Sequence, residues 1–456
     1  MDPVPHVVRI HCDRVLHDVR TGTASPGGAV SGTGVVVDVQ DGEHCVLTCY
    51  RLVEGAAEAR VVVPAVPGAP AVVCRVAAVH PHRGLAVLCG RLGPVAPAPI
   101  HPDWLVAPGS PVRCVGYDGA AQRVVDGAVP GYDAERGLLV LAAGVDPALS
   151  GAAVLDKDGA LVGTLCSPDD ETVVCVPVIF YRAMTHLGAG ETTLSDAELG
   201  VAYQPMTPHM VAALSRTGVV VTSIVPGSAA AAGGLQTMDV ITGLRIDDTD
   251  LPLREDGTVR GVPYCDQPVP LRDVLRFLLP RRTRLVVDVY RVQHWCGGGQ
   301  KLSLQLLPFA PPARTGQRRR VSPGLDAWPT VCVFGARFRS LRQNLLDAPC
   351  ERVAAVFLAN PRPHEERMMV TCVHGGVAEA CGVRVGDLVV AVNGTAVRTP
   401  EDLIAALDAP DCGGTVLVVE LEYLQEKKYI VVSASAQGEY ERTQHHYPPL
   451  EVAGRW

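Results

Sequence analysis

The chain is organised around Asp146-Pro147-Ala148-Leu149-Ser150-Gly151, which leads into the apolar run 152–164. That run holds Asp158-Gly159 between two short apolar stretches, a pattern that predicts a strand, a tight turn and a second strand. A serine on a tight loop before such a hairpin can act as a nucleophile, with the backbone amides of the loop facing an oxyanion. Because Ser-Gly pairs are also common in ordinary turns, the surrounding chain has to decide between the two.

Two segments upstream indicate which reading holds. Residues 31–38 read Ser-Gly-Thr-Gly-Val-Val-Val-Asp, and residues 45–56 read Cys-Val-Leu-Thr-Cys-Tyr-Arg-Leu-Val-Glu-Gly-Ala. Together with the stretch at Ser150, they resemble the HtrA/Deg family of serine proteases. In that family the second segment reads Leu-Thr-x-x-His-Val-Val-x-Gly-Ala, and the nucleophile region reads Asn-Pro-Gly-Asn-Ser-Gly-Gly. The resemblance places Ser150 at the nucleophile position and Arg51 at the position of the catalytic histidine.

The third catalytic position is also changed. Residues 80–88, His-Pro-His-Arg-Gly-Leu-Ala-Val-Leu, match a family pattern whose second aspartate orients the histidine, and Gly84 stands there. An arginine stays protonated and accepts no hydrogen bond, so Arg51 cannot serve as the general base. Glycine has no side chain to orient anything. Loss of both partners predicts a catalytic rate that is lower by a factor of about 10⁶.

The oxyanion loop departs from the family as well. Ala148 and Leu149 replace the Gly-Asn pair, and Ala152 replaces the second glycine after the serine, where glycine allows torsions that alanine resists. A rearranged base remains an alternative, because His80 and His82 flank the lost aspartate. Cys49 is expected on the same strand face as Arg51, either as a buried thiol or as a nucleophile.

Two later segments resemble PDZ domains. Residues 199–203, Leu-Gly-Val-Ala-Tyr, match the carboxylate-binding turn. The segment 226–235, in which a small-residue helix ending at glycine is predicted, precedes Met238-Asp239, where PDZ domains usually carry Gly-Asp. The polar insertion 255–270 resembles the first PDZ domain of plant- and protist-type Deg proteins. Residues 334–338, Phe-Gly-Ala-Arg-Phe, repeat the first pattern, which indicates an internal repeat. The peptide-binding turn predicted from the resemblance is Leu199, Gly200 and Val201.

These readings predict a mainly β fold, a chymotrypsin-like double β-barrel followed by two PDZ-like α+β domains. The expected divisions are a trypsin-like domain over 1–188, a first PDZ domain over 196–307, a linker over 308–328, a PDZ-like domain over 329–435 and a tail over 436–456. With 456 residues the chain is long enough for several separate cores.

The functional prediction is a pseudoprotease that acts as a peptide- or protein-binding scaffold or chaperone-like module. PDZ domains add an extended peptide to a sheet edge and hold its terminal carboxylate, so the expected partners are proteins or peptides with apolar C-termini. The resemblance also implies a homo-oligomer, a trimer or a multiple of one. Two alternatives stay open: a serine endopeptidase with a rearranged base around Ser150, and a structural or assembly component.

The composition argues against several other classes of protein. The net charge is −8 and only four of the 40 basic residues are lysines, which argues against nucleic-acid binding. No apolar stretch approaches the roughly 18 residues of a membrane-spanning helix. The 15 cysteines are scattered singly, so we expect reduced thiols, no metal site and no cofactor. Since the first residues resemble no signal peptide, a cytoplasmic location is expected.

Overall fold

The computed structural model describes most of the chain, in segments. They are residues 4–18, 24–64, 70–101, 106–133, 138–141, 146, 149–166, 174–178, 181, 184, 192–193, 199–226, 228–246, 249–262, 268–271, 273–274, 285–294, 298–306, 321–322, 324–326, 328–346, 350–359, 366–408, 416–424 and 426–433. The chain divides into two compact units. The first holds the strands up to residue 306, apart from His17 and Ala24, and the second holds those from residue 330 onward.

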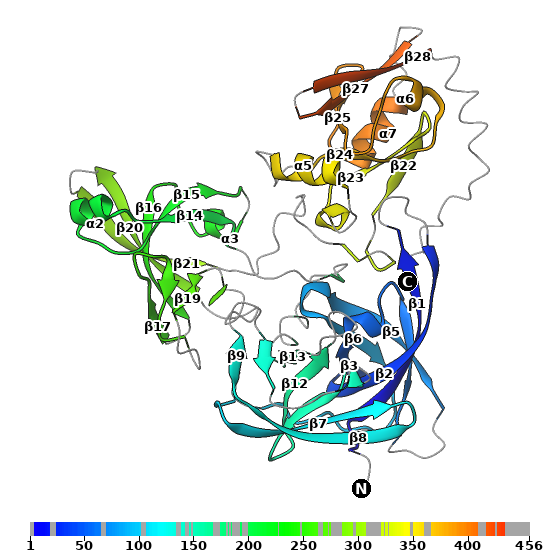
Figure 1. Cartoon of the computed structure of the whole chain (residues 1–456), viewed down its shortest axis with the longest axis vertical. Helices are drawn as coiled ribbons and strands as arrows, with labels where there is room; N and C mark the ends of the chain where they lie inside the picture. Colours follow the sequence, from blue (N-terminus) through cyan, green and yellow to red (C-terminus); the bar gives the residue numbers. More distant parts are fainter. Residues whose placement is uncertain are drawn as a thin grey trace. The chain divides into compact units, whose positions relative to one another are not determined.

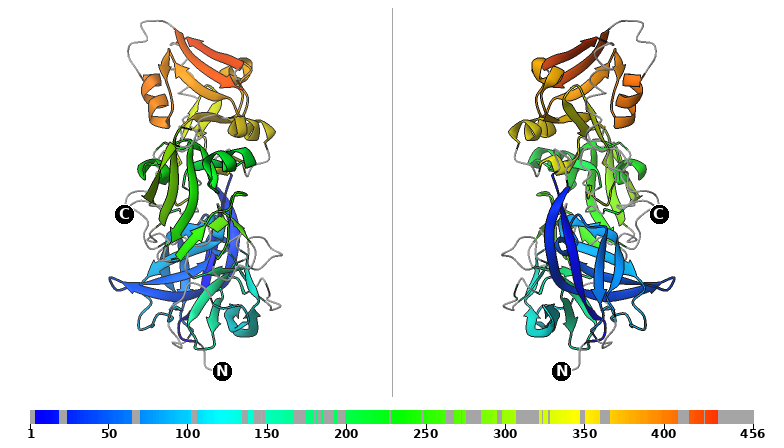
Figure 2. Two further views of the ribbon diagram at one scale, coloured as in Figure 1. Left: turned by 90° about the vertical axis from the view of Figure 1, so that its left-hand side faces the viewer. Right: turned by 90° about the vertical axis from the view of Figure 1, so that its right-hand side faces the viewer.

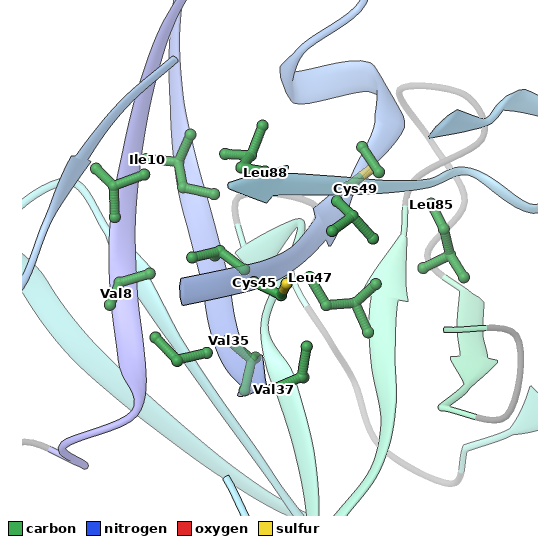
Figure 3. Packing of buried hydrophobic residues seen from close by; sticks show 14 of the residues in the cluster. Val8, Ile10, Val35, Val37, Cys45, Leu47, Cys49, Leu85 and Leu88 are labelled. Carbon is green, nitrogen blue, oxygen red and sulfur yellow. The ribbon is translucent and has the colours of Figure 1, made fainter. Parts of the chain in front are cut away.

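Six strands of the first unit form a closed barrel in the order β1-β2-β3-β6-β5-β4, drawn in blue in Figures 1 and 2. They are β1 (Val7–His17), β2 (Ala24–Gln40), β3 (Glu43–Cys49), β4 (Glu58–Val62), β5 (Val72–His80) and β6 (Leu85–Gly90). The turn between β2 and β3 has positive φ at both Asp41 and Gly42, as the favoured two-residue hairpin turns require. Side chains from β1, β2, β3 and β6 gather in one apolar cluster (Figure 3).

A seven-stranded antiparallel sheet follows, in the order β8-β7-β11-β12-β13-β10-β9. Its strands are β7 (Ser110–Asp118), β8 (Ala121–Val129), β9 (Gly131–Asp133), β10 (Leu138–Val140), β11 (Ala153–Asp156), β12 (Leu161–Cys166) and β13 (Val174–Pro177). The hairpin β11–β12 is the one predicted from Asp158-Gly159. Its turn is held by the Asp156 carboxylate, which accepts from the backbone N–H groups of Asp158 and Ala160, both over 2.8 Å.

The third sheet of the first unit has the order β14-β15-β16-β20-β21, with β17 paired to β16. Its elements are β14 (Val201–Pro205), α2 (Pro208–Leu214), β15 (Val219–Ile224), α3 (Ala229–Ala232), β16 (Asp239–Ile246), β17 (Thr249–Pro252), β20 (Leu285–His294) and β21 (Gly298–Leu306). Within the predicted insertion, β18 (Thr258–Val259) pairs with β19 (Val269–Pro270). Because Val259 and Val269 are buried in the core of this sheet, the described part of the insertion is packed structure.

The second unit repeats this topology with one strand more, in the order β22-β23-β24-β25-β27-β28. Its elements are β22 (Thr330–Val333), β23 (Ala336–Ser340), η4 (Gln343–Leu346), α5 (Glu351–Ala359), β24 (Met368–Val373), α6 (Gly376–Ala380), β25 (Leu388–Val392), β26 (Thr395–Ala396), α7 (Pro400–Asp408), β27 (Val416–Tyr423) and β28 (Glu426–Ser433). Strands β23, β24, β25, β26, β27 and β28 correspond to β14, β15, β16, β17, β20 and β21. The predicted fold class and the internal repeat are confirmed.

One local expectation was wrong. The sequence predicted a strand through Arg51, with Cys49 and Arg51 on one face, but β3 ends at Cys49. The chain then forms the 3₁₀ turn η1 (Tyr50–Leu52), in which strand alternation no longer applies. Among the helices in the described parts of the chain, none is both long enough and apolar enough to cross a bilayer.

Candidate functional site

Ser150 lies on the turn just before β11 and is fixed by backbone hydrogen bonds on both sides. Its carbonyl accepts from the N–H of Thr33 on β2 over 3.1 Å, and the N–H of Gly151 donates to the carbonyl of Leu165 on β12 over 2.7 Å. Gly151 has a φ of +85°, and a Cβ there would come within 1.9 Å of the Thr33 carbonyl oxygen. The serine is nearly buried, at 9% exposure. Glycine after the serine is therefore a steric requirement of this loop.

Arg51 and Gly84 lie on two short 3₁₀ turns that touch. The N–H of Tyr50, next to Arg51 in η1, donates to the carbonyl of Gly84 over 2.6 Å. Gly84 ends η2 (Pro81–Arg83) with a φ of +70°, and a Cβ added to it would lie 3.3 Å from the Cβ of Cys166.

Cys166 links this pair to the serine loop. It follows Leu165, whose carbonyl accepts the Gly151 N–H and whose N–H donates to the Ala152 carbonyl over 2.9 Å. The structure thus brings the segments that carry Arg51, Gly84 and Ser150 into one region through a chain of direct contacts.

The candidate bases differ in their surroundings. His80 ends β5 and is buried, at 1% exposure, whereas His82 is exposed on η2. Within the described residues, the Ser150 hydroxyl forms no hydrogen bond to an imidazole or a carboxylate. Serine attack needs a base within about 3.2 Å of the hydroxyl. The described geometry supplies none.

The thiols near the site are buried. Cys49 and Cys166 are both fully buried. Burial, together with a hydrogen bond to Cys49, raises the pKa of the Cys166 thiol well above its ordinary value. Because the thiolate is the nucleophilic form, Cys166 is unsuited to attack, and full burial leaves Cys49 without access to a substrate.

Of the two predicted oxyanion-loop residues, Ala148 lies outside the described residues and Leu149 is fully buried. Leu149 packs in the core of the seven-stranded sheet with Ala152 and Leu165. A Cβ at Gly116 would lie 2.7 Å from the Ala152 Cβ and 3.2 Å from a Leu149 methyl, so the packing is tight. Apolar packing therefore holds the start of this loop.

The predicted peptide-binding turn is held by hydrogen bonds to its carbonyl groups. The carbonyl of Leu199 accepts from the N–H of Ala230 over 2.9 Å, and that of Gly200 accepts from the N–H of Val225 over 2.8 Å. In a trans peptide the N–H points opposite to the carbonyl. The N–H groups of Gly200 and Val201 are thus directed away from Ala230 and Val225.

Val201 begins β14, the edge strand of its sheet, opposite Ile224 of β15. The hydrogen bond from the Val225 N–H to the Gly200 carbonyl joins the two residues next to this pair. Val201 and Ile224 are therefore a non-hydrogen-bonded pair, so the backbone N–H and carbonyl of Val201 face the outer edge of the sheet. Val201 also packs on the apolar cluster that contains Leu199, Leu271 and Val274. Among the described residues no strand covers this edge. The sequence also predicts a helix over 272–279 that lines this pocket; residues 273 and 274 are described, and residues 272 and 275–279 lie outside the described residues.

The second unit repeats the carbonyl pattern. Phe334 accepts from the N–H of Ala378 over 2.9 Å, and Gly335 accepts from that of His374 over 2.7 Å. Phe334, Gly335 and Ala336 thus occupy the positions of Leu199, Gly200 and Val201.

Comparison with known domains agrees with this geometry. Residues 32–163 match the trypsin-like peptidase domain family. The match spans β2 to β12 and includes Ser150, Arg51 and Gly84. Residues 369–420, from β24 into β27, match the PDZ domain family. Among curated proteins, none matches the chain in sequence.

Solved HtrA-type structures resemble the chain at low identity. One, described as the HtrA-type protease AlgW with a decapeptide, is 17% identical and has a TM-score of 0.44, covering 68% of this chain and 98% of that one. A serine endoprotease from Yersinia pestis is 15% identical with a TM-score of 0.41, covering 67% and 94%. Likeness at this level assigns no function.

Sequence reasoning missed several residues that build these sites. Thr48 donates its hydroxyl to the Thr33 carbonyl over 2.7 Å, beside the Gly151 backbone. Cys166, opposite Gly84, had no local signal, because only the fold brings them together. Strand β22 did have a local sequence signal, because apolar residues alternate at Val331 and Val333 just before the turn Phe334-Gly335.

Proposed function

We propose that this chain is an HtrA/Deg-like pseudoprotease that binds extended peptides through the edge of β14. The support for lost catalysis is local. Arg51 and Gly84 occupy positions that would need a base and its orienting carboxylate, and the described residues give the Ser150 hydroxyl no base. The rearranged endopeptidase and the purely structural component are the competing functions.

The observation that carries peptide binding is the fixed orientation of two adjacent amides. The carbonyls of Leu199 and Gly200 are held by Ala230 and Val225, which directs the N–H groups of Gly200 and Val201 away from Ala230 and Val225. Adjacent N–H groups of this kind bind a carboxylate, while the edge strand pairs with the ligand backbone. Val201 lines the site without a charge, which favours an apolar last residue. Such a small site predicts micromolar affinity, about −8 kcal/mol.

Calorimetric titration of the full chain with a C-terminal peptide library tests the binding, with each hit measured as the free acid and as the amide. The free acid should bind and the amide should lose most of its affinity. Val201→Glu should abolish binding, because it sets a negative charge beside the carboxylate. Ala202→Glu is the matched control, since Ala202 is exposed on the other face of β14. Equal affinity for acid and amide would rule out this turn as the site.

Catalysis is tested separately with a fluorophosphonate probe and an unfolded protein substrate. We expect neither labelling of Ser150 nor turnover. Stoichiometric labelling that disappears in Ser150→Ala would instead establish the rearranged endopeptidase. If peptides fail to bind and labelling is also absent, the structural component becomes the best remaining function.

The finer assignments stay proposals as well. We propose the plant- and protist-type Deg architecture, on the basis of the insertion that carries β18 and β19. A trimer or a multiple of one is also proposed, for which light scattering of the full chain is the check. The cytoplasmic location expected from the sequence also stays a proposal.

A further inference from the structure

The outer edge of β23 is covered by a strand of the same chain. β22 pairs with it in antiparallel register, with Thr330 opposite Arg339, Val331 opposite Phe338, Cys332 opposite Arg337 and Val333 opposite Ala336. In the first unit the corresponding strand, β14, has no such neighbour among the described residues. The two units thus differ at the edge where a peptide would add.

β22 also occupies the apolar side of this edge. Helix α7 packs against β22 as well as against β23 and β25 (Figure 1). Val331 is buried at 8% exposure and belongs to the apolar cluster that contains Leu403 of α7, and the half-buried Val333 packs against this cluster. The intervening Cys332 is exposed. β22 therefore presents alternate side chains to a helix beside an edge strand, which is how a peptide ligand lies in such a groove.

The end of β22 meets the carboxylate turn. Val333 pairs with Ala336 across Phe334 and Gly335, whose φ angles of +56° and +81° define a tight hairpin turn. The residues that flank such a two-residue turn exchange their backbone hydrogen bonds. Val333 thus forms the hydrogen bonds of the backbone N–H and carbonyl of Ala336. In the first unit, the same backbone groups of Val201 face the outer edge of β14. Where a ligand would end in a carboxylate, this chain continues into its own turn.

We propose that β22 is an intramolecular ligand, which fills the peptide groove of the second unit and closes it to peptides from other molecules. When β22 is released, the groove accepts an extended peptide with β-branched apolar residues at its last and third-last positions. This occupancy concerns a different groove from the proposed function and does not depend on it.

The test measures fluorescence anisotropy of a labelled peptide, Trp-Pro-Thr-Val-Ser-Val with a free carboxylate, which copies residues 328–333 with serine in place of Cys332. All proteins are full-length and carry Val201→Glu, so any remaining binding at the first unit is the same in each. The release variant adds Val331→Asp and Val333→Asp. Its matched control adds Thr330→Asp and Cys332→Asp, the same charge on the other face of β22.

The release variant should bind the peptide at least tenfold more tightly than its parent, whereas the control should match the parent. Hydrogen exchange should show β22 amides losing protection in the release variant while β24 and β25 keep theirs. If the release variant does not fold, Val331→Ser with Val333→Ser takes its place. Equal affinity of parent and release variant would overturn the proposal, because β22 would then block nothing.

Discussion

The backbone N–H of Tyr50 donates to the carbonyl of Gly84 over 2.6 Å, which joins the turn that holds Arg51 to the turn that Gly84 ends. Arg51 follows Tyr50 directly, so the backbones at the two predicted catalytic positions lie close together. Gly84 sits at a φ of +70°, a conformation that L side chains rarely adopt. A side chain added at position 84 would therefore be strained.

If the proposed loss of catalysis holds, placing histidine and aspartate at the two predicted catalytic positions should not create activity. In Arg51→His with Gly84→Asp, the new aspartate has a strained φ, and its Cβ points at the Cβ of Cys166 at 3.3 Å. We expect fluorophosphonate labelling no higher than in Ser150→Ala. Labelling of the double variant well above that control would show that the backbone still supports the catalytic geometry.

The glycine after Ser150 should be indispensable for folding of this loop. Gly151→Ala would bring a Cβ to 1.9 Å from the Thr33 carbonyl oxygen, at a φ of +85°. Since the contact is with backbone on another strand, we expect a loss of about 3 kcal/mol or more in the free energy of unfolding. Gly119→Ala is the control: its φ is +58° but no atom lies within 4 Å of the added Cβ. It should cost only about 1 kcal/mol, and denaturant unfolding followed by circular dichroism compares the two.

The two PDZ-like units offer a paired test of backbone strain. Met238 has a φ of +74°, and at the equivalent position of the second unit Gly386 has a φ of +95°. Met238→Gly should stabilise the first unit by about 1 kcal/mol, because it removes the cost of a side chain in the left-handed region. Gly386→Ala should destabilise the second by at least as much, since its Cβ would also lie 3.2 Å from the Cβ of Arg352.

Hydrogen exchange of β16 and β25 reports each unit separately. Slower exchange of β16 in Met238→Gly and faster exchange of β25 in Gly386→Ala are expected. No change in either strand would mean that the positive φ at these positions carries little strain.

Local patterns predicted much of the fold. Asp158-Gly159 between apolar stretches predicted the β11–β12 hairpin, because turn chemistry and strand alternation act over a few residues. The repeat of Leu199-Gly200 at Phe334-Gly335 also holds in the structure, since both glycines have positive φ and both turns use the same carbonyl bonds.

What the sequence could not predict depends on contacts between distant segments. β3 ends at Cys49, and the next residue, Tyr50, bonds to Gly84, which is far away in the chain. The contact of Gly84 with Cys166 has the same origin. The pairing of β22 with β23 was accessible in principle, but residues 330–333 alternate over too short a stretch to distinguish a strand from a linker end.

The last prediction concerns a buried carboxylate that each PDZ-like unit places at the start of a strand. In the second unit Asp387 is fully buried and accepts from the N–H of Arg384 over 2.9 Å, from Arg352 over 2.8 Å and from Lys428 over 3.1 Å. Asp387→Asn leaves two cations without their counter-charge, so the free energy of unfolding of this unit should fall by about 3 kcal/mol. Lys428→Met should cost less, because Arg352 still pairs with the carboxylate. The control Asp250→Asn removes an exposed pair with Arg245 and should cost less than about 1 kcal/mol. Exchange of β24 and β27 amides measures the loss for Asp387→Asn, and exchange of β16 and β20 amides measures it for Asp250→Asn. Comparable losses for the two variants would contradict a stabilising role for the buried carboxylate.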